Sequence, residues 1–139
     1  MFVRTLGHVV LKVRDLQRSE SFYSETLGMS IVTRISDPVP MTFFTLGNHH
    51  DFAIIEVGED APSPDPATTG LAHVAFKIGD SHDEFHAVKA ELDAANITIL
   101  YEADRSLTKS LHLHDPDGNE IELYADISDT WKTAQLVRN

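Results

Sequence analysis

Hydrophobic and polar residues alternate along several short stretches of the chain, and this period of two predicts β-strands. In SLHLHDPDGNEIELYAD, leucine and isoleucine side chains occupy one face, while His112, His114, Glu120 and Glu122 occupy the other. The segment DPDGN in the middle contains the proline and the glycine that tight turns require. The stretch is therefore predicted to be a β-hairpin, with Glu120 and His114 facing solvent.

The pattern of the first half of the chain recurs in the second half. GHVVLKVRDLQRSESFYSETLG and AHVAFKIGDSHDEFHAVKAELD both begin with a small residue, a histidine and a valine, and both carry a lysine at the same offset. His73 follows His8 by 65 residues (73 − 8), and Leu92 follows Leu27 by the same interval (92 − 27). Each copy is typical of a strand followed by a helix that starts at an aspartate or serine cap. The chain is therefore predicted to be a tandem duplication.

Three further strand-like stretches follow each predicted helix, which gives the order βαβββ twice. We expect the helices at about Asp15–Leu27 and Ser81–Ala95. We expect the strands that follow them near Met29–Ile35, Met41–Leu46, Asp51–Val57, Ile97–Tyr101, Lys109–His114 and Glu120–Tyr124. The predicted fold class is α+β, with tandem βαβββ modules that form a cupped mixed β-sheet with helices on the outside.

Length and composition indicate one globular domain. Module 1 is expected at about 1–60, followed by a linker at 61–70, module 2 at about 71–126 and a C-terminal tail at 127–139. With 42% hydrophobic and 24% charged residues, the sequence is typical of a folded protein. No apolar run is long enough to span a membrane and no signal segment is visible, so a cytoplasmic location is expected.

Charge and cysteine content narrow the function classes. The formal net charge of −11 disfavours nucleic acid and anionic membranes as partners, which leaves a small-molecule substrate as the expected partner. The chain has no cysteine, which excludes disulfides, thiolate zinc sites and a cysteine nucleophile. Any metal site must therefore use nitrogen and oxygen ligands.

The duplication suggests where such ligands lie. It supplies a histidine on the first strand and a glutamate at the end of the last strand of each half, namely His8 with Glu56 and His73 with Glu122. Two curved sheets related by a pseudo-twofold axis would bring some of these groups into one concave site. Two histidines and one carboxylate make the open facial triad of non-haem iron sites. A duplication alone would also explain the repeated pattern without any metal.

Two segments resemble the vicinal oxygen chelate superfamily, which includes glyoxalase I, extradiol ring-cleaving dioxygenases, and fosfomycin and bleomycin resistance proteins. HVVLKVRDLQRSESFYSETLGM is similar to the glyoxalase-type opening pattern, and DPDGNEIEL is similar to the closing hairpin. The resemblance covers essentially the whole chain. It implies that His8, His73 and Glu122 are the metal ligands, with Glu56 as a candidate fourth ligand, and a homodimer is expected.

NHHDFAII resembles the His-His stretch of the extradiol dioxygenases, in which the second histidine is the acid/base; here that residue is His50. On a strand, His50 would share a face with Phe52 and Ile54. This chain has Arg105 and His112 where the dioxygenase pattern carries a histidine and a tyrosine. The resemblance implies catalytic roles for His50 and His112 and a substrate contact for Arg105. It further implies a catecholic or other vicinal-oxygen substrate and Fe(II), with nickel, zinc or manganese as alternatives.

Two other functions are compatible with the same resemblance. A glyoxalase I-type lyase acting on a thiohemiacetal would hold nickel or zinc with His8, Glu56, His73 and Glu122. A bleomycin-type protein would bind a small molecule without a metal, and chelator treatment would then leave its binding unchanged. We favour a dioxygenase-like oxidoreductase, because His50 matches the acid/base position of the extradiol enzymes.

Overall fold

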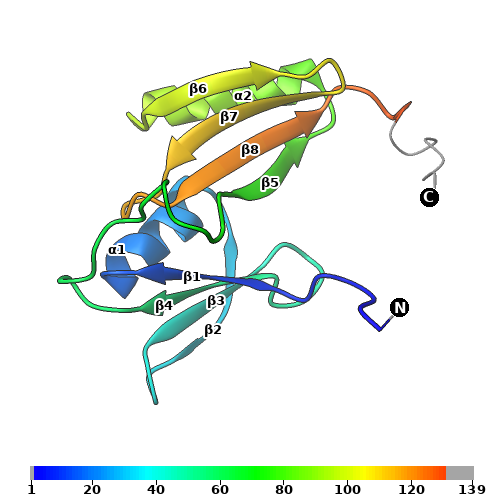
Figure 1. Cartoon of the computed structure of the whole chain (residues 1–139). Helices are drawn as coiled ribbons and strands as arrows, with labels where there is room; N and C mark the ends of the chain where they lie inside the picture. The colour runs from blue at the N-terminus through cyan, green and yellow to red at the C-terminus, as the bar shows by residue number, and fades with distance from the viewer. Residues whose placement is uncertain (1, 131–139) are drawn as a thin grey trace. The chain divides into compact units, whose positions relative to one another are not determined.

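Both predicted modules are present in the computed structural model, which describes residues 2–130 (Figure 1). Met1 and the part of the predicted tail from residue 131 onwards lie outside the described residues. The elements are, in order, β1 (Val9–Val13), α1 (Leu16–Ser21), η1 (Phe22–Thr26), β2 (Ser30–Ile35), β3 (Met41–Thr45), β4 (Phe52–Glu56), β5 (Val74–Gly79), α2 (His82–Ala94), β6 (Ile99–Asp104), β7 (Thr108–His114) and β8 (Glu120–Asp126). The predicted βαβββ order is confirmed in both halves.

Each module forms its own four-stranded mixed sheet. The strand order is β1-β4-β3-β2 in the first sheet and β5-β8-β7-β6 in the second. In both sheets the first and last strands of the module pair in parallel, and the other neighbours pair in antiparallel fashion. The predicted α+β class, with tandem βαβββ modules and mixed sheets, is therefore confirmed.

The chain forms two compact units. One contains the first module up to Pro64 together with the turn Asp115–Asn119. The other contains Asp65–His114 together with the chain from Glu120 onwards. The turn between β7 and β8 therefore belongs to the first unit, although both of these strands belong to the second.

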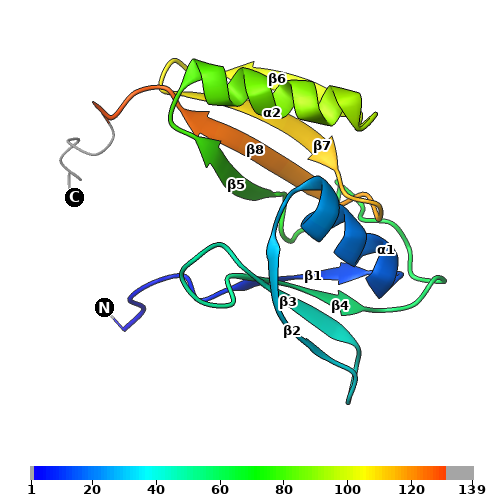
Figure 2. The same cartoon turned by 180° about the vertical axis from the view of Figure 1, so that it is seen from behind.

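The core of the first unit lies between its sheet and its first helix. Alternation along β1 puts Leu11 and Val13 into this core and leaves Val10 and Lys12 on the opposite face. Helix α1 packs against β3 and β4 on the core side (Figure 2). The buried hydrophobic residues on this side are Leu11, Val13, Phe22, Tyr23, Met29, Phe44, Phe52 and Ile54, and Ala53 is buried on the opposite face.

The first predicted helix changes its geometry half-way along. Asp15 caps the start, because its carboxylate accepts a hydrogen bond from the N–H of Arg18 at 2.8 Å. After α1 the chain continues as the π-helix η1, in which the N–H of Leu27 donates to the carbonyl of Phe22 at 3.0 Å. Tyr23 lies in this wider turn with no exposed surface.

Two buried aspartates hold the turn Asp115–Asn119. The carboxylate of Asp115 accepts hydrogen bonds from the backbone N–H groups of Asp117 at 2.9 Å and Asn119 at 2.8 Å. It also accepts one from the hydroxyl of Tyr23 at 2.7 Å. The carboxylate of Asp117 accepts hydrogen bonds from three residues of the first module, Arg14, Arg18 and Ser19. The turn is thereby fastened to the first helix and the π-helix.

Helix α2 covers one face of the second sheet (Figure 2). The hydroxyl of Ser81 accepts from the N–H of Glu84 at 3.2 Å, and the carboxylate of Glu84 accepts from the N–H of Asp80 at 2.8 Å, which together cap the helix start. The buried hydrophobic residues of this unit are Phe76, Phe85, Leu92, Leu111, Leu113, Ile121, Leu123 and Ala125. Within residues 2–130, no helix has the length and apolar character needed to cross a membrane.

Replacing Tyr23 by Phe should lower the free energy of unfolding by about 1–3 kcal/mol, because the buried carboxylate of Asp115 then loses its hydroxyl donor. Burial, followed by the charge of Asp115, raises the pKa of Tyr23, so the phenol keeps the proton that it donates. Urea unfolding followed by circular dichroism measures the difference. Tyr124→Phe is the control, since the Tyr124 hydroxyl makes no hydrogen bond within the described residues. Equal losses in the two variants would contradict this role for Tyr23.

Candidate functional site

The side chains predicted to form the site divide between the two units. The first unit contains His8, His50 and Glu56, and the second contains His73, Arg105, His112 and Glu122. Within each unit, strand pairing decides which of these side chains share a face.

One face of the second sheet carries a row of polar side chains. Tyr101 of β6 is paired with His112 of β7, and His112 is paired with Glu122 of β8. Glu122 is in turn paired with Ala75 of β5. Because paired residues on neighbouring strands point to the same face, the three polar side chains lie side by side. His73 directly precedes β5, and its contact with Glu122 places it on the same face.

His73 and Glu122 are in direct contact. The Nε2 atom of His73 lies 3.0 Å from Oε2 of Glu122. The Nε2 atom of His112 lies 3.8 Å from the other carboxylate oxygen, Oε1. When two ligand atoms each lie about 2.1 Å from the same divalent ion, at right angles to each other, the distance between the two atoms is about 3 Å. The contact therefore fits two neighbouring ligands of such an ion, and it also fits a hydrogen-bonded ion pair.

Glu120 holds the ring of His112, so the prediction that Glu120 only faces solvent is wrong. His112 is 1% exposed, and its Nδ1 lies 2.8 Å from Oε1 of Glu120. A carboxylate accepts hydrogen bonds, so Nδ1 of His112 is the donor of this bond. Burial raises the pKa of Glu120, but the hydrogen bonds from His112 and Tyr101 outweigh it, and the pKa is lowered. Glu120 therefore stays ionised beside the ring.

Tyr101 belongs to the same cluster of side chains as His73, His112, Glu120 and Glu122, and the sequence pattern did not predict this. Its ring stacks on that of His112, with centroids 4.1 Å apart and planes inclined by 14°. Its hydroxyl donates to Oε1 of Glu120 at 3.0 Å. Burial and then the hydrogen bond to Glu120 raise the pKa of Tyr101. A bulge between Ile99 and Tyr101 sets the pairing with His112, and the alternation in ILYEAD does not mark that bulge.

Arg105 lies in the turn between β6 and β7. Its backbone N–H donates to the carbonyl of Thr108 at 3.0 Å, and its side chain is exposed. In the described part of the chain its guanidinium makes no hydrogen bond. Its positive charge acts on Tyr101 by lowering the pKa of that phenol, against the larger effects of burial and Glu120. The predicted substrate contact of Arg105 stays a prediction.

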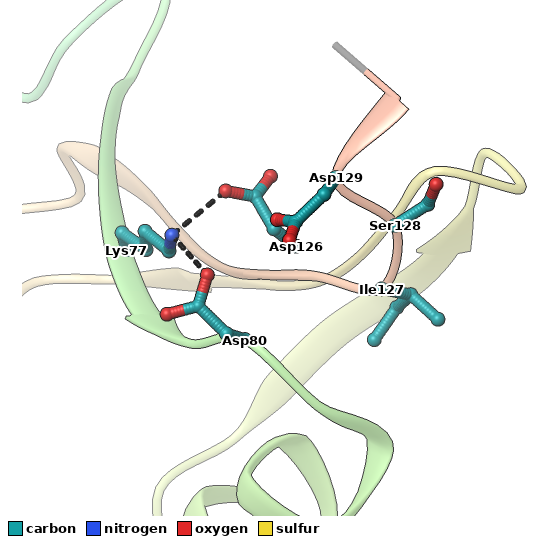
Figure 3. A pocket seen from close by; sticks show the side chains of 6 residues that line it. All are labelled: Lys77, Asp80, Asp126, Ile127, Ser128 and Asp129. Atoms are coloured by element: carbon teal, nitrogen blue, oxygen red, sulfur yellow. Dashed lines mark hydrogen bonds and ion pairs between the residues drawn. The ribbon is translucent and has the colours of Figure 1, made fainter. Parts of the chain in front are cut away.

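The same face continues past Glu122 into a cavity of about 310 Å³ (Figure 3). Lys77 is paired with Tyr124, and Asp126 follows Tyr124 by two residues, so Lys77 and Asp126 share this face. The Nζ atom of Lys77 lies 2.8 Å from Oδ2 of Asp126, and it also binds Asp80. The hydrogen bonds to Asp126 and then Asp80 raise the pKa of Lys77. Lys77 is therefore a paired cation that ties β5 to β8.

In the first unit, His8 and His50 lie next to each other. Their ring centroids are 4.8 Å apart, and the ring of His50 also meets that of Phe43 edge-on, with centroids 5.5 Å apart. Phe43 is paired with Ala53, and Ala53 with Val10, so Phe43 lies on the face of the sheet opposite the core. His50 and His8 therefore meet on that open face.

The prediction that His50 shares a face with Phe52 and Ile54 is wrong. Both of these residues are buried in the core, whereas the ring of His50 contacts Phe43 on the opposite face. The reason is that β4 begins only at Phe52, so the alternation of a strand does not extend back to His50. Burial, then His49 and His8, lower the pKa of His50, against a raising effect of Asp51.

Glu56 supports the start of the first helix. Its Oε2 accepts a hydrogen bond from the N–H of Leu16, the first residue of α1, at 3.0 Å. Glu56 is paired with Val13, which is buried in the core. The carboxylate thus lies on the helix side of the sheet, away from the face that carries His50.

The predicted correspondence between Glu56 and Glu122 is also wrong. Glu56 ends β4, but Glu122 is only the third residue of β8, which continues to Asp126. His8 and His73 each directly precede the first strand of their module, and the residue two positions after each of them is paired with a residue of the last strand. That partner is Glu122 in the second sheet and Ala53 in the first. The first module therefore has no carboxylate at the position that Glu122 occupies.

Among residues 2–130, no group of three or more histidine, aspartate and glutamate side chains is arranged to hold a metal ion as it stands. The second unit supplies two adjacent ligand groups, His73 and Glu122. Imidazole nitrogen and carboxylate oxygen are ligand types that suit divalent first-row metals. The donor chemistry of these residues therefore fits such an ion.

Relatives of known function include dioxygenases and a lyase. Biphenyl-2,3-diol 1,2-dioxygenase 3 of Rhodococcus globerulus is 33% identical over 125 residues, which are 87% of this chain and 63% of the relative. Catechol-2,3-dioxygenase of Bacillus subtilis (strain 168) is 30% identical over 125 residues, 87% of this chain and 41% of the relative. Lactoylglutathione lyase of Escherichia coli O157:H7 is 28% identical over 126 residues, which are 85% of this chain and 90% of the relative. The chain thus spans less than two thirds of either dioxygenase.

A solved structure and a family model agree with these relatives. The crystal structure of a glyoxylase/bleomycin resistance protein/dioxygenase domain from Frankia sp. EAN1pec matches with a TM-score of 0.77 and 22% identity, over 91% of this chain and 95% of that chain. This match shows the shared fold. The family model covers residues 5–123, and the predicted resemblance is confirmed. The chain belongs to the Glyoxalase/Bleomycin resistance protein/Dioxygenase superfamily.

Proposed function

We propose that this chain is a divalent-metal-dependent enzyme of the dioxygenase type that acts on a catecholic or other vicinal-oxygen substrate. His8, His73 and Glu122 are the proposed ligands, with Fe(II) as the metal, and His50 is the proposed acid/base. The observation that carries the proposal is the 3.0 Å contact between His73 and Glu122, beside the buried ring of His112. The relatives named for biphenyl-2,3-diol and catechol support the choice of substrate class.

The chain's own residues have separate tasks in this proposal. A bound divalent ion would act as a Lewis acid toward two neighbouring substrate oxygens, and three protein ligands leave positions open for them. His50, next to His8, would take the proton that a hydroxyl loses on binding. His112 is 1% exposed and its Nδ1 binds Glu120, so it would act indirectly, by holding Glu120 and the stacked ring of Tyr101 in place. The half-exposed ring of Tyr101 offers a flat surface to an aromatic substrate.

The position of Glu56 favours this function over a glyoxalase I-type reaction. That reaction would use Glu56 as a fourth ligand. Its carboxylate instead binds the N–H of Leu16 on the core side of the first sheet. We therefore leave Glu56 out of the proposed ligand set. The expected homodimer and the cytoplasmic location stay predictions from the sequence.

Glu122→Gln should reduce the metal content of the purified protein by at least about tenfold, since an amide oxygen carries no charge and is a weaker ligand than a carboxylate. Elemental analysis after anaerobic purification with added Fe(II) measures the metal per chain. Glu91→Gln is the matched control, because Glu91 is exposed on α2.

Full stoichiometric iron in Glu122→Gln would remove Glu122 from the ligand set. Glu56→Gln is expected to keep its metal, because the carboxylate of Glu56 binds the helix start. Loss of metal from Glu56→Gln would instead restore the four-ligand, glyoxalase-like arrangement.

His50→Ala should keep its metal and lose roughly 10²- to 10⁴-fold in turnover, the usual contribution of a general acid or base. Oxygen uptake with a panel of catechols measures turnover, and a methylglyoxal–glutathione assay on nickel and zinc forms tests the lyase alternative. His86→Ala, at an exposed position of α2, is the control. Metal loss in His50→Ala would count against the acid/base role. Metal-dependent thioester formation without oxygen uptake would replace the dioxygenase proposal.

A further inference from the structure

We infer that Asp51 is a positioning residue that holds His50 against His8 on the open face of the first sheet. The inference rests on the proposed function, in which His50 is the acid/base. Strand alternation would send His50 to the core side with Phe52, yet the ring of His50 lies beside His8 and Phe43.

The segment between β3 and β4 is a closed loop rather than a continuation of either strand. β3 ends at Thr45 and β4 begins at Phe52, and the residues between them form a series of bends. Gly47 adopts a φ of 103°, a conformation that other residues rarely take, and its N–H donates to the hydroxyl of Thr45 at 3.0 Å. The path of this loop therefore decides where His50 points.

The carboxylate of Asp51 gathers donors from this loop. Its Oδ2 accepts from the N–H of Leu46 at 2.8 Å, from the hydroxyl of Thr45 at 3.3 Å and from the N–H of His49 at 3.4 Å. These hydrogen bonds, led by the one from Leu46 and joined by Asn48, lower the pKa of Asp51 to about 2 against the effect of burial. The side chain is therefore ionised at neutral pH. Its Oδ2 atom connects the start of the loop, at Thr45 and Leu46, to His49 near its end.

The backbone of Asp51 fixes the loop to the strand that follows His8. The carbonyl of Asp51 accepts a hydrogen bond from the N–H of Val9, the first residue of β1, at 3.1 Å. The residues before and after His50, namely His49 and Asp51, are thus both fixed by hydrogen bonds. On one side the N–H of His49 binds the Asp51 carboxylate, and on the other side Asp51 itself is bound to β1. The ring of His50 lies against those of His49, His8 and Phe43, with centroids 4.0, 4.8 and 5.5 Å away.

If Asp51 only stabilised the fold, its replacement would give a different experimental result. If Asp51 only strengthened the fold, its replacement would lower the unfolding midpoint, and the geometry of the folded protein would stay the same. A positioning role moves one ring relative to another in a protein that is still folded. A misplacement of about 1 Å in a catalytic group can cost up to about 10²-fold in rate.

The experiment compares Asp51→Ala and Asp51→Asn with Asp60→Asn, which makes the same chemical change at an exposed position of the same unit. Nuclear Overhauser effects between the ring protons of His50 and those of His8 and Phe43 report the position of the ring without any metal or substrate. Metal content, kcat and KM are then measured on the iron form. All three variants carry His8, so each is expected to bind wild-type amounts of metal.

In Asp51→Ala, we expect the contacts from His50 to His8 and Phe43 to disappear and kcat to fall roughly 10- to 100-fold, with KM little changed. Asp51→Asn keeps one acceptor oxygen and should restore part of both signals. Asp60→Asn should match the wild type. Unchanged ring contacts in Asp51→Ala would overturn the inference, and so would lost contacts with an unchanged kcat.

The ring contacts also separate this inference from the proposed function. If the wild type shows no oxygen uptake with any catechol, the dioxygenase proposal fails. The positioning of His50 by Asp51 is then judged on the nuclear Overhauser effects alone, which need no turnover. Their loss in Asp51→Ala and recovery in Asp51→Asn would support it, and their persistence would reject it.

Discussion

The parallel pairing of the first and last strands of each module decides which side chains can act together. Parallel neighbours in register point to the same face, so the residue opposite Ala75 is the one that can reach His73. In the second sheet that residue is Glu122, and a contact of 3.0 Å results. In the first sheet the corresponding residue is Ala53. The two modules therefore share a fold, while only the second has an adjacent histidine and glutamate.

Much of the fold could be predicted because it depends on periodicity, caps and turn residues. The alternation in SLHLHDPDGNEIELYAD gave the hairpin, and Asp15 and Ser81 cap the two helices as expected. These features are local, since each is encoded within a few neighbouring residues. The duplication extended the prediction to the order of all elements, because the same local signals occur twice in the same sequence.

The features that were predicted wrongly or missed depend on the long-range register of the strands or on irregular backbone. Glu56 falls on the core side because β4 pairs with β1 in a register that the sequence does not state. Tyr101 reaches His112 through a bulge, and His50 leaves the strand pattern because a loop precedes Phe52. Such departures are common at functional sites, where side chains are redirected from the regular pattern. The candidate site is therefore the part of the molecule that alternation predicts least well.

In the polar cluster of the second unit, the buried His112 differs in its surroundings from the more exposed His73 and Tyr101. In the described residues, no buried side-chain nitrogen or oxygen lacks a hydrogen-bond partner. Turning the ring of His112 would break its contact with the ionised Glu120, at a cost of about 1–3 kcal/mol. His73 and Tyr101 are more exposed, and a ligand can reach them without such a loss. The ring of His112 is therefore held in one orientation, and the more exposed His73 and Tyr101 are the residues to which the proposed function assigns contact with metal and substrate.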